Sequence, residues 1–213
     1  MPNRLALARD VLKQAEIHTG VRSVTPYDND ESVYRVPHYL SAVFPHGINY
    51  GSVIELSGSL AVCMLVGGII AEYGGWVAHV GIPEWSWDVA LKSGIRTEKC
   101  IAITDVKHEL NAVLSSLIDG CSVVIVSSSL VPKKYQRTLE RKARSRRCVV
   151  VSWGSWQGSS QHIDATIREI HGSVLREATG ITEIGPICGI DYEITSRAGS
   201  TCVNFSKKGW CGA

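Results

Sequence analysis

Five short runs rich in valine and isoleucine recur between residues 52 and 153, and this alternation constrains the fold more than any other feature of the sequence. The predicted strands cover residues 52–57, 76–82, 99–103, 122–126 and 148–153. Continuous apolar strands that alternate with helices are typical of a parallel sheet with helices on both faces. The sequence therefore predicts an α/β fold with a mostly parallel central sheet.

The segments between these strands predict four helices. They cover residues 60–71, 86–94, 105–120 and 132–147. Ser86 and Asp105 are expected as N-caps, because their side-chain oxygens can accept hydrogen bonds from the first turn. Gly94 and Gly120 are expected to end the second and third helices. Pro132 suits the first turn of the fourth helix.

The first of these helices, LAVCMLVGGIIA over residues 60–71, is apolar on every side. It has twelve residues, whereas about 20 are needed to cross a bilayer. Glu55 and Glu72 bracket it closely. A short helix that is apolar all round predicts a buried core helix and no membrane association.

The two ends of the chain differ from this core. Residues 1–36 predict an N-terminal arm, with a helix over 4–19 and a polar linker after it. This helix either packs on its own domain or docks on another chain. Residues 37–160 form the predicted core. Residues 161–213 predict short alternating strands separated by glycines, which would form an antiparallel extension at the edge of the sheet and a C-terminal tail.

Composition places the chain among ordinary globular proteins. Its 213 residues are 45% hydrophobic and carry a net charge of +2, too small to imply a polyanionic partner. The seven cysteines show no metal-ligand spacing, and the first residues lack the apolar core of a secretion signal. We expect a cytoplasmic protein with mostly free, buried thiols, a Cys202–Cys211 disulfide being the alternative.

The segment GSLAVCML after the first strand has the position of a phosphate-binding loop. Such a loop, G-x-x-x-x-G-K-[ST], surrounds phosphates with backbone N–H groups, and its lysine and hydroxyl hold phosphate and Mg²⁺. Here the spacing from Gly58 and Ser59 is kept, but Cys63, Met64 and Leu65 replace the second glycine, the lysine and the hydroxyl residue. This vestigial loop is not expected to function, although a helix N-terminus can still attract an anion weakly.

The second half of an ATPase site is an acid at the end of a neighbouring strand. The strand over 122–126 is followed by three serines, residues 127–129, and no acid. Glu84 could act as a general base, but without a metal or phosphate clamp it would have nothing to activate. We therefore expect no enzyme activity, no cofactor and no metal site.

Two segments carry a resemblance to a known family: LSAVFPHGINYGSVIELSG, and the chain through IDGCSVVIVSSS. They resemble the core of the RecA recombinase superfamily, in which a strand of the form G-x-V-x-E leads into the phosphate loop. Together with GGWVA, VGIP, ARSRR and GIDYEITSRAG, the ordered set is most similar to the ImuA-type accessory proteins of actinobacteria. The resemblance covers about two thirds of the chain.

The resemblance implies a function. ImuA-type proteins belong to a damage-induced complex for mutagenic translesion synthesis, beside an inactive Y-family polymerase relative of the ImuB type and an error-prone polymerase. The expected role is a non-catalytic adaptor in the SOS response that binds such a protein and also DNA. The alternatives are a divergent RecA-type ATPase or recombinase and a single-stranded-DNA-binding protein.

The helix over 132–147 is the first candidate for a DNA contact. It holds eight basic residues and one acid, Glu140. The candidate contacts are Lys133, Lys134, Arg137, Arg141, Lys142 and Arg144. Four of them recur every three or four residues and so share a face. This stripe either neutralises DNA phosphates or is the solvated outer face of a helix that covers the sheet.

Trp153 and Trp156, in the segment WGSWQGSSQH, are the second candidate. They could stack on unpaired bases. The alternative, that both pack against the sheet, is favoured because the segment has no lysine or arginine. Trp85 and Trp87 are expected to fill the former nucleotide site. In the tail, Trp210 belongs either to a protein-docking peptide or to a frayed end.

Overall fold

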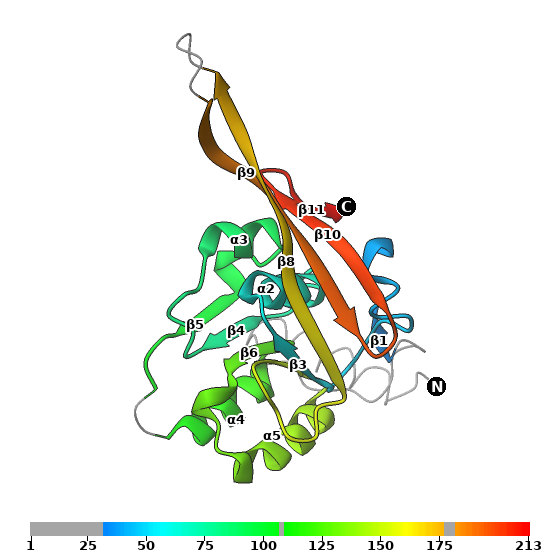
Figure 1. Cartoon of the computed structure of the whole chain (residues 1–213). Helices are drawn as coiled ribbons and strands as arrows, with labels where there is room; N and C mark the ends of the chain where they lie inside the picture. Colours follow the sequence, from blue (N-terminus) through cyan, green and yellow to red (C-terminus); the bar gives the residue numbers. More distant parts are fainter. Residues whose placement is uncertain (1–31, 107–108, 177–181) are drawn as a thin grey trace, which may run out of the picture. The chain divides into compact units, whose positions relative to one another are not determined.

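A nine-stranded mixed sheet forms the centre of the structure (Figure 1). The computed structural model describes residues 32–106, 109–176 and 182–213, all within one unit, Glu31–Ala213. The sheet order is β11-β10-β9-β8-β3-β7-β6-β4-β5. The other unit, Met1–Asp30, lies outside the described residues, and so does the predicted helix over 4–19.

The five predicted strands are confirmed, each to within two residues at either end. They are β3 (Val53–Ser57), β4 (Val77–Val80), β5 (Cys100–Ile103), β6 (Val123–Ser127) and β7 (Val149–Trp153). All neighbouring pairs among them are parallel, with β3 beside β7 and β6 between β7 and β4. The sequence thus correctly predicts the parallel core of the sheet.

Helices cover both faces of this core, as predicted. The helices are α2 (Leu60–Ala71), α3 (Trp87–Lys92), α4 (Leu110–Gly120) and α5 (Lys133–Arg146). Side chains of α2 and α3 pack with Val123 and Ile125 of β6, whereas side chains of α4 and α5 pack with Val124 and Val126. Because successive side chains of a strand point to opposite faces, the two helix pairs lie on opposite sides of the sheet.

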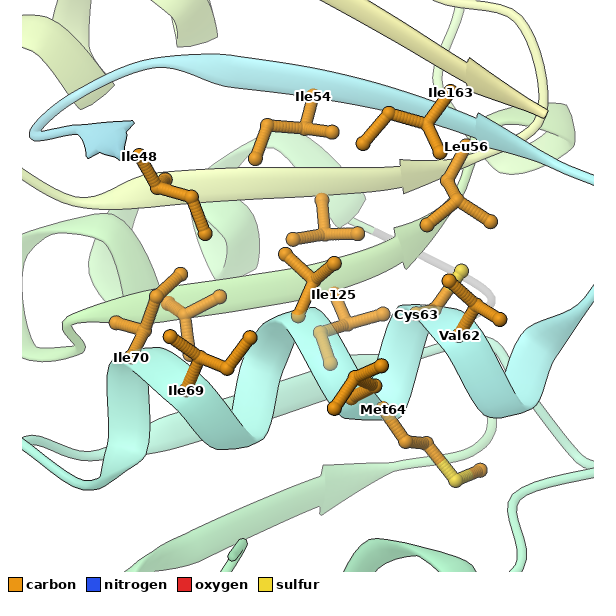
Figure 2. Packing of buried hydrophobic residues seen from close by; sticks show 14 of the residues in the cluster. Ile48, Ile54, Leu56, Val62, Cys63, Met64, Ile69, Ile70, Ile125 and Ile163 are labelled. Carbon is orange, nitrogen blue, oxygen red and sulfur yellow. The ribbon is translucent and has the colours of Figure 1, made fainter. Parts of the chain in front are cut away.

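Helix α2 is the predicted buried core helix. Nine of its twelve residues are buried, and Met64 is only 1% exposed. Figure 2 shows Val62 and Cys63 directed toward the strands, while Met64 projects from the other side of the helix. Both sides of α2 therefore have apolar partners. Within the described part of the chain, no helix has both the length and the apolar character to span a membrane.

Both predicted ends of α3 are correct, and so is the predicted end of α4 at Gly120, but the predicted start of α4 is wrong. Ser86 caps α3, since its Oγ accepts from the Val89 N–H at 3.4 Å, and Gly94 follows the helix with a φ of +97°. Asp105 is not an N-cap, because α4 begins at Leu110. Its first turn instead follows Glu109, whose φ of 63° is unusual for a residue with a side chain.

The antiparallel extension is confirmed, but its strands are longer than predicted. They are β8 (Gln161–Arg176), β9 (Thr182–Ser196), β10 (Ser200–Ser206) and β11 (Gly209–Gly212). Gly172 does not separate two strands, because it lies inside β8 next to register shifts in the β8–β9 pairing. Bulges accommodate such a glycine without ending the strand. The outer parts of β8 and β9 extend past their neighbours (Figure 1).

Short elements complete the fold. One of them lies in the region through residue 36 that was predicted to be a linker. Val33–Tyr34 form β1, which pairs with β2 (Ile48–Asn49). Tyr34 is buried against the core. Three 3-10 helices cover His38–Leu40 (η1), Thr97–Lys99 (η2) and Ser128–Leu130 (η3).

Candidate functional site

The turn between β3 and α2 is too short to be a phosphate-binding loop. Only Gly58 and Ser59 separate the strand from the helix. Cys63, Met64 and Leu65 therefore lie within α2, where all three are buried. The Cys63 N–H already bonds to the Ser59 carbonyl oxygen. One backbone N–H that would face a phosphate is thus used within the helix, which supports the expectation that this segment does not bind a triphosphate.

Strand β8 lies directly against this turn. A Cβ added at Gly58, whose φ is +82°, would collide with the Ala165 carbonyl oxygen. The Ser57 Oγ donates to Asp164 Oδ1 at 2.6 Å. Burial raises the pKa of Tyr192 on β9, and a hydrogen bond with Ser59 opposes that rise. Protein groups, including a carboxylate, therefore take the place beside the start of α2 that a phosphate would need.

Hydroxyls follow β6, where an ATPase would have an acid. Ser127 ends β6, and its Oγ lies 2.9 Å from Ser129 Oγ. Glu84 lies exposed in the turn between β4 and α3. Trp85, in the same turn, is almost fully buried, and its ring stacks on His79 with 4.1 Å between centroids. Trp87 packs edge-on against both rings but remains 42% exposed.

His79 was not singled out by the sequence, because a lone histidine in an apolar strand gives no motif. Its side chain is 1% exposed, and neither ring nitrogen has a hydrogen-bond partner among the described residues. Burial lowers its pKa from 6.5 to about 4. The ring is therefore neutral near pH 7, and protonating it requires charge to be placed in a site that offers no acceptor.

The basic helix α5 is divided between two roles. Its buried face consists of Gln136, Leu139 and Ala143. Lys142 binds Asp119 of α4 at 2.6 Å, and Arg146 binds the same carboxylate at 2.8 Å. Arg144 pairs with Glu140 at 3.2 Å. Of the six predicted DNA contacts, Lys142 is half-buried and Arg144 is exposed, and both form ion pairs within the protein. Lys133, Lys134, Arg137 and Arg141 are exposed.

Trp153 and Trp156 pack into the protein, as the favoured alternative predicted. Trp156 is 2% exposed and belongs to the apolar cluster on the α4 and α5 side of the sheet. Trp153, the last residue of β7, packs against the cluster on the other side. Trp156 therefore cannot stack on a base in this conformation, which corrects its assignment as a DNA contact.

The C-terminal tail is not a frayed end. It forms β10 and β11, joined by a turn through Lys207 and Lys208. The Trp210 ring packs against Tyr192 and Phe205, and its Nε1 donates to Ser93 Oγ at 2.8 Å. The seven cysteines, Cys202 and Cys211 included, are free thiols.

A network around Glu55 was also missed by sequence reasoning. Glu55 lies on β3 beside His162 of β8, and its Oε1 is 3.2 Å from the His162 Nδ1. Its Oε2 accepts from the Trp156 N–H at 3.2 Å and from Ser159 Oγ at 3.1 Å. One carboxylate thus fixes the loop between β7 and β8. The only signal in the sequence is an acid within an otherwise apolar strand.

A second group of polar side chains lies on the β8–β9 hairpin. His171 Nε2 lies 2.9 Å from Asp191 Oδ2, and its Nδ1 lies 3.8 Å from Glu169 Oε1. Asn204 donates to the other Asp191 oxygen at 2.6 Å. The hydrogen bond to Asp191 raises the pKa of His171. Glu169, His171 and Asp191 have ligand atoms close enough to share a metal ion. A histidine that bridges two carboxylates explains the same arrangement equally well.

No curated protein matches this chain. A family model described as the MT3502 N-terminal domain matches residues 42–158, which is more than half of the sequence. The match runs from just before β2 to the loop after β7 and so includes the parallel core with all four described helices. The chain therefore belongs to the MT3502 N-terminal domain family.

Proposed function

We propose that this protein is a non-catalytic, RecA-like adaptor in DNA damage tolerance, which binds a Y-family-like polymerase partner of the translesion synthesis complex. The sequence resemblance supports the RecA-like assignment. The parallel core also supports it, because β3, the strand with the ELSG segment, pairs in parallel with β7 and leads through a two-residue turn into α2.

The observation that carries the non-catalytic part is the short turn before α2. Met64 stands where a phosphate-binding lysine would be, but it lies inside a helix and is 1% exposed. A lysine that reaches a phosphate and a hydroxyl that holds Mg²⁺ each supply about 1.5–3 kcal/mol. Loss of both, together with a helix that starts two residues after β3, leaves too little interaction for micromolar ATP affinity.

Affinity capture of the tagged, full-length chain from cells treated with a DNA-damaging agent tests the adaptor role. Quantitative mass spectrometry should show a polymerase-like protein enriched over a capture from untreated cells. A capture with the tag alone controls for non-specific retention. Capture of the same proteins with and without damage, with no polymerase relative among them, would contradict the proposal.

Direct DNA contact through α5 is the second candidate, favoured by the four exposed basic residues at its N-terminal and central turns. These residues are Lys133, Lys134, Arg137 and Arg141. Binding of a single-stranded oligothymidine should weaken with salt and weaken further in the double variant Arg137→Glu/Arg141→Glu. Arg96→Glu, which reverses an exposed charge outside α5, is the matched control. Equal affinity of both variants would identify the stripe as a solvated face.

A further inference from the structure

A small polar pocket lies at the opposite end of β3 from the vestigial loop. It has a volume of about 280 Å³, at the lower end of the range for ligand pockets. Three separate parts of the chain line it: the turn before β2, the loop between β7 and β8, and the turn between β9 and β10. The pocket has three basic side chains. His46 comes from the turn before β2, His162 from the start of β8, and Arg197 from the turn between β9 and β10.

The charges of this pocket favour an anion. Arg197 lies on a tight turn, in which the Ser196 N–H bonds to the Gly199 carbonyl at 2.8 Å and the Ala198 N–H bonds to Ser196 Oγ at 3.1 Å. Two histidines accompany it, and no acidic residue is among the side chains that line the pocket. A planar guanidinium binds phosphate through two parallel hydrogen bonds.

The His162 ring is held in a defined orientation. Its Nδ1 lies 3.2 Å from Glu55 Oε1, and Glu55 is itself fixed by the Trp156 N–H and the Ser159 hydroxyl. A carboxylate that holds the proton on Nδ1 leaves Nε2 to accept a hydrogen bond from a protonated phosphate oxygen or, in the imidazolium form, to donate one. The side chain is half exposed, so this second nitrogen is accessible to a ligand in the pocket.

Most of the neutral polar side chains of the pocket are already used as donors inside the protein. Ser52 Oγ donates to the Asn49 carbonyl and Ser160 Oγ to the Val53 carbonyl, each at 2.7 Å. Gln161 Nε2 and Ser196 Oγ both donate to the Val43 carbonyl. Because these groups hold the wall together, the Arg197 guanidinium and the two imidazoles are the groups most available to a ligand.

From this arrangement we infer that the pocket binds a phosphate group, as inorganic phosphate or as a small phosphate monoester. Arg197 supplies the principal charge, and His162, oriented by Glu55, supplies a second contact from the β8 side. This inference does not depend on the adaptor function, because it concerns a site at the other end of β3 and uses none of the residues of α5.

Titration of the ¹⁵N-labelled full chain with sodium phosphate, at constant ionic strength kept with sodium chloride, tests the inference by NMR. We expect saturable shifts that centre on residues 159–162 and 196–199. Arg197→Gln should weaken the affinity about tenfold or more, as expected for loss of a charge-assisted contact. His162→Gln should weaken it less, and the control Arg141→Gln should stay within about twofold of the wild type.

O-phosphoserine, titrated in the same way, distinguishes a monoester site from one for free phosphate. Arg197 is exposed, so its variant should fold, and its spectrum verifies this. Shifts that grow linearly without saturation would overturn the inference, and so would a saturable curve that is unchanged in Arg197→Gln. An effect of Arg197→Gln on oligothymidine binding, without any on phosphate, would also overturn it, because it would make this surface a DNA contact.

Discussion

The carbonyl oxygen of Ala165 lies where a side chain on Gly58 would have to be. Glycine is required at position 58 for two reasons. A side chain would collide with β8, and the φ of +82° disfavours any other residue. The glycine that would open a phosphate loop in another protein thus serves here to let two backbones approach. Its role is structural, and its replacement tests that role.

Gly58→Ala should destabilise the protein by about 3 kcal/mol or more, because the left-handed backbone and the collision with Ala165 both add to the cost. Gly74→Ala is the matched control: its φ is +86°, but a Cβ there meets no atom within 4 Å. That variant should lose only about 1 kcal/mol. Urea unfolding measures both. Equal losses would show that β8 does not press on Gly58.

Met64→Lys introduces the charge of a phosphate-binding lysine but not the loop in which such a lysine reaches a phosphate. The residue is 1% exposed within α2, so the ammonium group would be buried without a partner. We expect a loss of about 3–5 kcal/mol in unfolding free energy and no gain in ATP affinity. Met64→Leu, which keeps the side chain apolar, should cost less than about 1.5 kcal/mol. A folded Met64→Lys protein that binds ATP would disprove this account of α2.

His79 should make the protein less stable in acid. Its pKa is lowered from 6.5 to about 4 in the folded state, so the unfolded chain binds the proton more readily. Stability is therefore retained above about pH 6.5 and falls as the pH drops toward 4, by about 3 kcal/mol in total. Urea unfolding of the wild type at several pH values between these limits measures this loss.

His79→Leu removes the titrating group, so its unfolding free energy should change less over the same pH range. His46→Gln, which replaces an exposed histidine, should keep the slope of the wild type. If the slope of His79→Leu equals that of the wild type, carboxylates elsewhere cause the acid sensitivity and the buried imidazole does not.

Trp156→Ala should destabilise the protein by about 3–5 kcal/mol, because it empties a site in the core beside Leu139 and Val150. Trp87→Ala removes the same side chain from a position that is 42% exposed, and less than half of that loss is expected. Thermal unfolding compares the two. A Trp156 variant as stable as the wild type would reopen the possibility that this tryptophan is available to DNA.

The parallel core could be predicted from the sequence because its strands are buried on both faces. In runs such as VVIV over 123–126 every residue is apolar, so the prediction does not depend on deciding which face of the strand is buried. Helix α2 is apolar on every side, so it has to be buried on every side. The start of α4 could not be predicted in this way, since Asp105 is a better N-cap by residue type than Glu109, and the left-handed φ at Glu109 depends on tertiary context.

The parts that sequence reasoning missed depend on contacts between distant segments. Glu55 and His162 become neighbours only because β8 pairs with β3, and a β-strand pattern does not specify its partner. The same holds for Trp210, which lies on the edge strand β11 and donates a hydrogen bond to the distant Ser93. The long β8–β9 hairpin was predicted as shorter pieces, because a glycine at a bulge and a glycine at a turn look alike in sequence.

The central claim is that the turn before α2 does not bind the phosphates of ATP. Isothermal titration calorimetry of the wild-type protein with ATP and Mg²⁺ tests this claim most directly. The account predicts no saturable binding in the micromolar range and no release of inorganic phosphate. Micromolar, Mg²⁺-dependent binding that is lost when Ser59 is replaced by tryptophan would contradict it.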